Sequence, residues 1–303
     1  MLSMMIKKHI WCFILTCILI LLHPDSGQTE KRKIFRNGII ADAFSGVNQN
    51  DARIALNILL AKQLKTEYKT ETVIYPDIHA AIQDIKNGKL DLLTLPTMDY
   101  ILARDQIQMK PEMISGVGPE KEQSYILLVN EGSNIKSLSQ LNNKNLIVEK
   151  GAGGKLALKW IDTLLLEESL PESGVFFREI KQVDKSSRAL LPVFFGQADG
   201  CIVRNYAFET MVELNPQVGK KLLVLNRSPV LGSTLLCFSP GIEKKLANKI
   251  INFIQKMPDH IEHRQVLLLF QVKQIFRYKP EYLQNLETLL HRYEELKQKA
   301  VKH

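Results

Sequence analysis

The chain has 303 residues, of which 45% are hydrophobic, and a formal net charge of +8. This composition excludes a disordered protein, and the length suggests two domains or lobes. The basic residues are scattered rather than clustered with aromatic residues, which argues against a nucleic-acid-binding protein. A small anionic ligand or a negatively charged membrane surface remains compatible with this charge.

The first 27 residues differ from the rest of the chain. Lys7, Lys8 and His9 precede an apolar run from Ile10 to Leu22, and a polar stretch follows. The run is short for a membrane span and has the layout of a secretory signal peptide. We therefore expect residues 1–27 to be a signal peptide and the protein to be periplasmic. Because no Ala-x-Ala cleavage pattern follows the run, an uncleaved N-terminal membrane anchor stays open as an alternative.

Past this leader, strand-like and helix-like stretches alternate. Strands are predicted at residues 34–44, 71–76 and 90–96, and helices at residues 48–68 and 77–88. Asn50 or Asp51 is the expected cap of the first helix, and Gly88 is expected to end the second. This βαβαβ order predicts a mainly parallel sheet flanked by helices.

A second α/β unit is predicted after an apolar strand at residues 124–130. It comprises a strand, turn and helix over residues 145–160, followed by a helix that Ser186 or Ser187 caps and Gly196 ends. Two of the chain's four cysteines lie in the leader, and we expect the others, Cys201 and Cys237, to be buried thiols because they lie in apolar, strand-like segments.

The remaining segment is rich in predicted helices, and the last of them, over residues 280–303, is amphipathic. Its charged face predicts a solvated surface, with a partner helix as the alternative. We therefore expect an α/β protein with two lobes and a helical C-terminal tail. Lobe I would comprise residues 33–122 and 232–303, and lobe II residues 123–231 with the hinge strands.

The turn in "NLIVEKGAGGKLALKW" (residues 145–160) joins a predicted strand to a predicted helix. Glycine at such a position lets backbone N–H groups converge on an anion at the positive end of the helix. A Walker loop is excluded, because Glu149 and Leu156 occupy positions that require Gly and Ser or Thr. The dinucleotide-binding fingerprint also fails at Leu156. The turn is therefore a general anion-site candidate, and a plain strand-to-helix connection is the alternative.

No catalytic constellation is found in the sequence. The chain has no G-x-S-x-G, no H-E-x-x-H and no recognisable cysteine–histidine pair, so we expect neither an enzyme nor a cofactor. His260 and His263 have the spacing of metal ligands on a helix, but no further ligands are identifiable. We therefore predict no metal site.

Other polar residues follow predicted strands. Thr97, Asp99 and Tyr100 come after a buried strand, where open α/β sheets bind ligands. The alternative is a helix cap with a packed aromatic residue, and for Asp99 this alternative is favoured. Arg204 follows another strand, and its guanidinium suits a carboxylate or phosphate if it is not simply exposed.

Three segments together invite a family comparison: residues 75–103, residues 124–154 and residues 186–209. In this order and spacing they resemble the phosphonate-binding family of ABC-transporter solute receptors, over roughly residues 35–255. The resemblance implies an exported protein with the type II periplasmic-binding-protein fold, in which two α/β lobes joined by a hinge close on a small ligand. It also implies that the glycine turn lies in the cleft.

Within this resemblance, individual positions depart from the family pattern. Gly151 to Gly154 stand where the family has a Ser-Thr-Ser-Gly loop, so backbone N–H groups would replace hydroxyl donors. Ser186 stands in the place of a histidine, and Gln123 and Ile78 stand in the places of two tyrosines of the cleft. Arg204 stands where an acidic residue serves an amine, which implies a ligand with a further anionic group.

The sequence thus predicts a solute-binding protein that delivers a phosphonate, phosphate or organic acid to a membrane permease, with no nucleic acid involved. A periplasmic sensor that signals to a membrane histidine kinase or cyclase is the alternative. The candidate ligand-binding residues are Thr97, Tyr100, Gln123, Gly151, Ala152, Gly153, Ser186, Ser187 and Arg204.

Overall fold

The computed structural model describes residues 33–43, 48–64, 67–115, 124–232, 234–269, 272 and 274–301. The predicted leader and the candidate residue Gln123 lie outside the described residues. None of the helices in the described ranges is long and apolar enough to cross a membrane.

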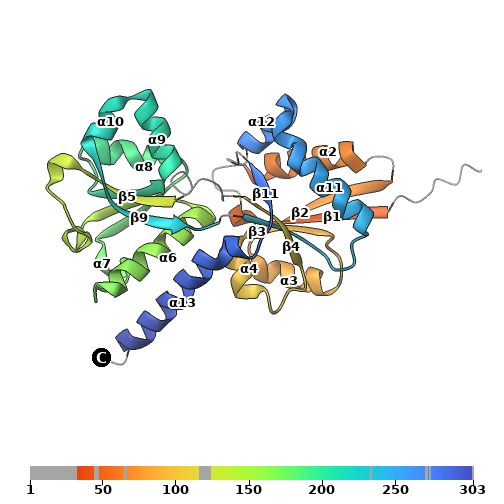
Figure 1. The fold of residues 1–303 in the computed structure, drawn as a ribbon, viewed down its shortest axis with the longest axis horizontal. Coiled ribbons are helices and arrows are strands. Elements are labelled where there is room, and N and C mark those ends of the chain that lie inside the picture. Colours follow the sequence, from red (N-terminus) through yellow and green to blue (C-terminus); the bar gives the residue numbers. More distant parts are fainter. Residues whose placement is uncertain are drawn as a thin grey trace, which may run out of the picture. The chain divides into compact units, whose positions relative to one another are not determined.

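The first sheet has six strands in the order β11-β4-β10-β3-β1-β2 (Figure 1). Its strands are β1 (Lys33–Ile40), β2 (Tyr68–Tyr75), β3 (Leu92–Pro96), β4 (Lys110–Ser115), β10 (Thr234–Phe238) and β11 (Ile275–Arg277). Strands β1 and β3 are parallel, whereas β10 is antiparallel to both β3 and β4, and β11 is antiparallel to β4. Chain segments far apart in sequence therefore complete this sheet.

The second sheet has five strands in the order β7-β6-β8-β5-β9. Its strands are β5 (Ser124–Asn130), β6 (Asn145–Glu149), β7 (Glu179–Val183), β8 (Gly200–Arg204) and β9 (Leu222–Val230). Strand β6 is parallel to β7 and β8, while β5 is antiparallel to β8 and β9. The two predicted α/β sheets are confirmed, but both are mixed rather than mainly parallel, because antiparallel strands extend the parallel core of each.

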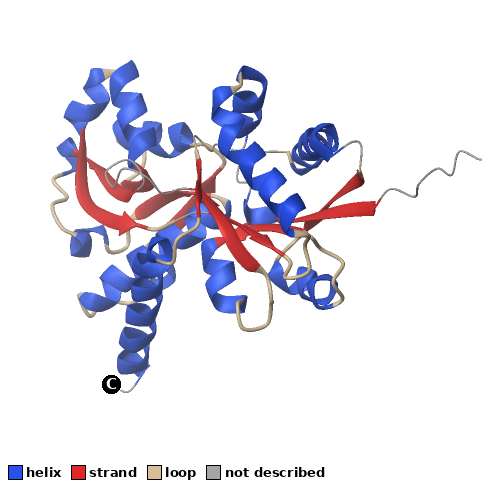
Figure 2. Ribbon diagram, turned by 45° about the vertical axis from the view of Figure 1, so that its right-hand side comes forward, coloured by secondary structure: helices blue, strands red, loops and turns tan. Residues whose placement is uncertain are grey.

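Helices flank both sheets (Figure 2). The α-helices are α2 (Gln49–Leu64), α3 (Ile78–Lys86), α4 (Thr97–Ala103), α6 (Gly151–Glu167), α7 (Ser173–Phe176), α8 (Ser186–Phe194), α9 (Asn205–Leu214), α10 (Pro216–Lys221), α11 (Lys244–Lys256), α12 (Ile261–Leu269) and α13 (Glu281–Val301). Short 3-10 helices are η1 (Ala41–Ala43), η2 (Glu131–Ser133), η3 (Leu138–Leu141) and η4 (Met257–Asp259).

Two predicted N-caps are wrong, while the predicted glycine ends are confirmed. The side chain of Asn48, not that of Asn50 or Asp51, accepts the first N–H groups of α2 at 2.9 and 3.3 Å. The cap position of α8 is Lys185, and Ser186 is the first helical residue, so its hydroxyl is available for another partner. Gly88 follows α3 and Gly196 follows α8 with φ of 65° and 71°, the left-handed conformation that glycine permits.

The two faces of β5 pack into different cores, as the alternation of side chains along a strand requires. Tyr125, Leu127 and Val129 share one core with apolar residues of α6 and α13. Ile126 and Leu128 share the other with α8 and with the partly buried side chains of α9. Cys201 belongs to this second core and Cys237 to the core of the first sheet; both are buried free thiols, as predicted.

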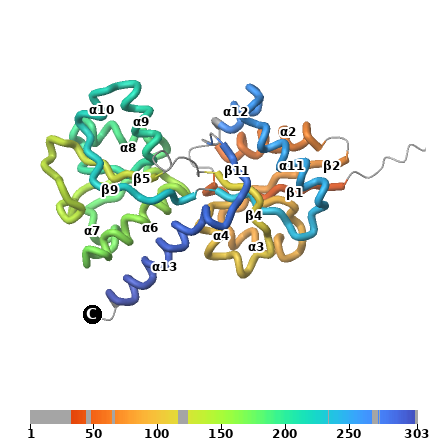
Figure 3. Tube along the Cα trace, viewed as in Figure 1, coloured from red at the N-terminus to blue at the C-terminus, as the bar shows by residue number. Residues whose placement is uncertain are grey.

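Helix α13 runs beside α6 (Figure 3). Its apolar face contributes Leu286 and Leu289 to the core that it shares with α6. Tyr293 and Lys297 of α13 both hydrogen-bond to Glu172, just before α7. The predicted amphipathic helix is confirmed, and its apolar face packs within this chain.

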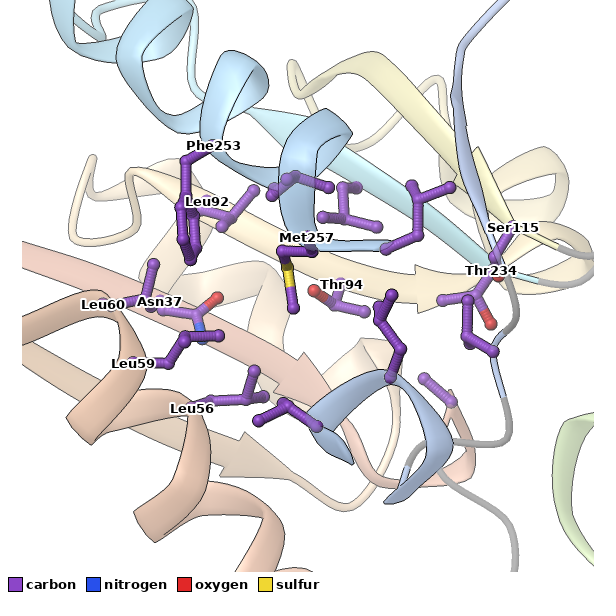
Figure 4. Close-up of a pocket in the computed structure, with 17 residues that line it drawn as sticks. Asn37, Leu56, Leu59, Leu60, Leu92, Thr94, Ser115, Thr234, Phe253 and Met257 are labelled. Carbon is purple, nitrogen blue, oxygen red and sulfur yellow. The ribbon is translucent and has the colours of Figure 1, made fainter. Parts of the chain in front are cut away.

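A cavity of about 90 Å³ lies between the first sheet and helices α2, α11 and α12 (Figure 4). Its lining is almost entirely apolar and includes Leu56, Leu59, Leu92, Phe253 and Met257. Asn37 of β1 also lines it; this side chain is only 2% exposed, and its Oδ1 has no hydrogen-bond partner in the described part of the chain. The lining offers an anion no positive charge, so the cavity is a packing feature of the first sheet.

Replacing Asn37 with leucine is expected to raise the free energy of unfolding by about 1–2 kcal/mol. The change removes a buried, unpaired carbonyl and places apolar atoms beside the cavity. Urea unfolding followed by circular dichroism measures the effect, with Asn37→Asp as the control that keeps the size and adds charge. A lower stability of the leucine variant would contradict this account and would indicate that a buried water satisfies the carbonyl.

Candidate functional site

The carboxyl ends of β6 and β8 mark a change of direction in the second sheet. These parallel strands are neighbours, with Val148 opposite Ile202. Strand β6 leads into α6, which packs on one face of the sheet, whereas β8 leads into α9, which packs on the other. Open α/β sheets bind ligands outside the strand ends where the chain diverges in this way. The glycine turn after β6 and Arg204 at the end of β8 lie at this point.

The glycine turn forms the N-terminus of α6. Gly151 has a φ of 77°, and the preceding Lys150 provides no side-chain cap. The first N–H groups of a helix have no acceptor within it and carry partial positive charge, so this end of a 17-residue helix favours an anion.

Gly153 and Gly154 have different neighbours. A Cβ at Gly154 would lie 1.7 Å from the carbonyl oxygen of Glu149, so this position excludes any side chain. A Cβ at Gly153 would lie 3.4 Å from the hydroxyl of Tyr125, an ordinary contact. Gly154 therefore serves the close approach of helix and strand, while Gly153 keeps the space in front of Tyr125 open.

Tyr125 and Arg204 are opposite each other on β5 and β8. Tyr125 is 2% exposed, and the Arg204 guanidinium carbon lies 4.9 Å from the centre of its ring. The Tyr125 hydroxyl and the Arg204 Nη1 are both buried, and the two groups interact electrostatically, but neither forms a well-aligned hydrogen bond within the described residues. Burial raises the pKa of Tyr125, so its hydroxyl stays protonated and can donate.

Unpaired buried donors are uncommon in folded proteins, and each costs about 1–3 kcal/mol. Here two such donors lie beside a helix N-terminus, and one of them carries a full positive charge. An anion bound at this point would satisfy all three groups. The arrangement therefore has the chemistry of an anion site that is incomplete without its ligand.

Ser186 and Ser187 begin α8 at the same edge of the sheet. The Ser186 hydroxyl donates a hydrogen bond to Oε1 of Glu149, the last residue of β6. Lys150 and Asp184 form an ion pair nearby, with 3.3 Å between Nζ and Oδ1. The carboxylate of Glu149 thus lies close to the glycine turn at the N-terminus of α6.

The candidates on the first sheet have other contacts. The buried hydroxyl of Thr97 donates to the carbonyl oxygen of Gly232 at 2.6 Å, just before β10. Tyr100 packs against the core of the first sheet, where burial raises its pKa to about 12. Burial also raises the pKa of Asp99, although the nearby Lys155 opposes this shift. Lys155 itself forms a hydrogen bond with Asp42, after β1.

The two histidines singled out in the sequence lie close together, with ring centres 5.2 Å apart. His263 also packs edge-on against Phe253. Within the described ranges, no three histidine, cysteine or acidic residues gather closely enough to hold a metal ion.

Tyr125 was missed by the sequence analysis, which assigned the place of a cleft tyrosine to Gln123. Tyr125 lies two residues further on, inside β5 and beside the glycine turn. A usable signal was present, because Tyr125 is the only hydroxyl-bearing residue between Ser124 and the end of an otherwise apolar strand. A buried tyrosine hydroxyl normally needs a partner.

The chain was compared with known protein families. Residues 43–281 match the family described as ABC transporter, phosphonate, periplasmic substrate-binding protein. The chain belongs to this family. Its members are substrate-binding proteins and not enzymes, and the family expected from the sequence is confirmed. Comparison with curated proteins gives no match.

Solved structures of this phosphonate-binding family and of related receptors share the fold. A binding component of an ABC phosphonate transporter from Pseudomonas aeruginosa is 16% identical, with a TM-score of 0.60 and coverage of 89% of both chains. PhnD1 from Prochlorococcus marinus, in complex with methylphosphonate, is 16% identical, with a TM-score of 0.57 over 86% of this chain and 98% of that one. The aliphatic sulphonate-binding protein SsuA from Escherichia coli is 13% identical, with a TM-score of 0.51 over 89% and 88%.

These low identities establish the fold alone. It is the type II periplasmic-binding-protein fold, with two mixed sheets flanked by helices, as the sequence resemblance implied. This phosphonate-binding family member therefore captures a small ligand as the substrate-binding component of an ABC transporter.

Proposed function

We propose that this protein binds a small phosphonate- or phosphate-like anion at the N-terminus of α6 and delivers it to a membrane permease. The anion would accept hydrogen bonds from the first N–H groups of α6, from the Tyr125 hydroxyl and from the Arg204 guanidinium. The observation that carries the proposal is that the buried donors of Tyr125 and Arg204, beside the glycine turn, have no well-aligned acceptor in the part of the chain that the structure describes.

The comparisons support this ligand class. The family is described as phosphonate-binding, and PhnD1 was solved with methylphosphonate. The sequence resemblance suggested that Arg204 contacts a second anionic group at the far end of the ligand. Because Arg204 lies over Tyr125, which faces the turn, we assign its guanidinium to the same anionic group that the turn binds.

The remaining candidates receive narrower roles in this proposal. Ser186 and Ser187 border the anion position from α8, while Thr97 and Tyr100 support the strand connection and the core of the first sheet. A signal peptide over residues 1–27 accords with the periplasmic location of the family, and the family match favours transport over sensing.

Replacing Gly153 with aspartate is expected to weaken methylphosphonate binding at least about 100-fold, since a like charge placed beside an anion costs several kcal/mol. The Cβ itself fits, because it would lie 3.4 Å from the Tyr125 hydroxyl. Isothermal titration calorimetry with methylphosphonate and inorganic phosphate measures the effect.

Gly153→Ala is the matched control, because it adds the same first atom without the charge. The proposal requires that alanine retain more affinity than aspartate while thermal unfolding shows both variants to be folded. Unchanged affinity in the folded aspartate variant would refute an anion site at this turn.

A further inference from the structure

Glu149 is a carboxylate at a site built for an anion. It ends β6, two residues before the start of α6, and lies opposite Val183 of β7. Its Oε1 accepts the hydrogen bond from Ser186. Its charge also contributes to the raised pKa values of Tyr125 and Tyr206, which places it within electrostatic range of the buried donors.

Within the described ranges, Glu149 has no ion pair of its own. Lys150 pairs with Asp184 at 3.3 Å, and Arg188 lies 3.7 Å from the other oxygen of Asp184. The same region is faced by Arg204 at the end of β8, Tyr125 of β5 and Tyr206 of α9. Although burial opposes the shift, the pKa of Arg204 is raised by Tyr125, Tyr206 and Glu149. The Glu149 carboxylate thus lies next to the proposed ligand position with Ser186 as its hydrogen-bond partner.

This placement has opposite consequences for two kinds of oxyanion. A carboxylate has two oxygens and about four lone-pair positions, and Ser186 occupies one of them. A ligand that keeps an acidic hydroxyl can donate it to Glu149 in a charge-assisted hydrogen bond. A ligand with oxygen acceptors alone meets the carboxylate with like charge, which disfavours binding.

We infer that Glu149 makes the site selective for oxyanions that retain a proton, so that monoprotonated phosphonates and phosphate bind in preference to sulfonates and sulfate. The inference rests on the proposed anion site and adds its selectivity. Glu149 accepts the ligand hydroxyl, while Arg204, Tyr125 and the N-terminus of α6 bind the remaining oxygens.

Methylphosphonate and methanesulfonate provide the test, because they have closely similar size and shape but only the former retains a second acidic proton. We expect the full chain to bind methylphosphonate at least about tenfold more tightly in calorimetry near neutral pH, a difference of about 1.4 kcal/mol. In Glu149→Gln, the preference should fall to within about threefold, chiefly because methanesulfonate gains affinity. Glutamine keeps an oxygen that can accept from Ser186.

Asp184→Asn is the matched control, because it removes one negative charge two residues before Ser186 without touching Glu149. It should leave the preference unchanged. If Asp184→Asn lost the preference for methylphosphonate to the same extent, the effect would come from the overall negative charge around the site rather than from Glu149. This result would overturn the inference.

The wild-type measurements separate this inference from the proposed site. Equal affinities for the two ligands would overturn the selectivity while leaving the anion site intact; binding of neither ligand would overturn both. Should Glu149→Gln not fold, the pH dependence in the wild type decides. Methylphosphonate affinity must then fall relative to that of methanesulfonate above the second ionisation of methylphosphonate, and a constant ratio would refute the inference.

Discussion

Replacing Arg204 with alanine is expected to weaken methylphosphonate binding by about 2–5 kcal/mol, the range found when one partner of a buried charge pair is removed. The guanidinium lies over the Tyr125 ring, and its buried Nη1 has no well-aligned acceptor among the residues that the structure describes. In the complex, the ligand would supply the missing acceptor, so the alanine variant would leave the anion without its principal counter-charge. Calorimetric titration of wild type and variant measures the loss.

Two further variants distinguish binding from folding. Arg178→Ala is the control for lost charge, because Arg178 is an exposed arginine that bonds Asn145 at the opposite end of β6. Arg204→Met should bind poorly yet unfold at a temperature close to that of the wild type, since the substitution removes a buried donor without a well-aligned hydrogen bond and replaces it with an apolar side chain of similar length. Full affinity in Arg204→Ala, or a marked loss of stability in Arg204→Met, would make Arg204 a structural residue.

Replacing Gly154 with alanine is expected to lower the free energy of unfolding by about 3 kcal/mol or more, or to prevent folding, because strain of this kind produces the largest single-residue effects. The added Cβ would lie 1.7 Å from the backbone oxygen of Glu149 and 2.8 Å from its carbonyl carbon. No side-chain rotation relieves a contact with backbone, so α6 must move away from β6. Urea unfolding measures the loss.

The neighbouring glycine provides the comparison. Gly153→Ala meets only the Tyr125 hydroxyl, at 3.4 Å, and should unfold within about 1 kcal/mol of the wild type. Similar stability of the two alanine variants would show that α6 can shift freely at its first turn, which contradicts a turn fixed in place for ligand binding.

Local sequence patterns were sufficient for most of the elements. Alternating strand-like and helix-like stretches predicted both α/β sheets, and glycine spacing predicted the turn at α6. Strand direction was less accessible, because a buried strand with an apolar centre, such as β5, indicates burial on both faces without indicating a parallel or antiparallel neighbour. The cap of α2 was misplaced by two or three residues because Asn48, Asn50 and Asp51 are all good capping residues.

The site itself was only partly accessible from sequence. The glycine turn and Arg204 were singled out, but their proximity depends on the pairing of β6 with β8 and of β8 with β5. Tyr125 becomes a candidate only once the structure shows that its buried hydroxyl faces Gly153 and has no well-aligned hydrogen bond within the described ranges. Glu149 was noted only as a departure from the Walker pattern, because nothing in the sequence places it beside Ser186.

The packing of α13 against α6 has a consequence for the order in which the chain can fold. The core beneath the anion site contains residues from Tyr125 to Leu289, and the hydrogen bond between Tyr293 and Glu172 joins residues 121 positions apart. The second sheet can therefore form its strands early, but this core is sealed only when α13 is present and docks against α6. Contacts of such long sequence separation slow folding and leave apolar surface exposed in the meantime. Before α13 docks, the apolar residues of α6 that α13 covers would be exposed to solvent. Stable ordering of the turn at the N-terminus of α6 would thus be among the last events of folding.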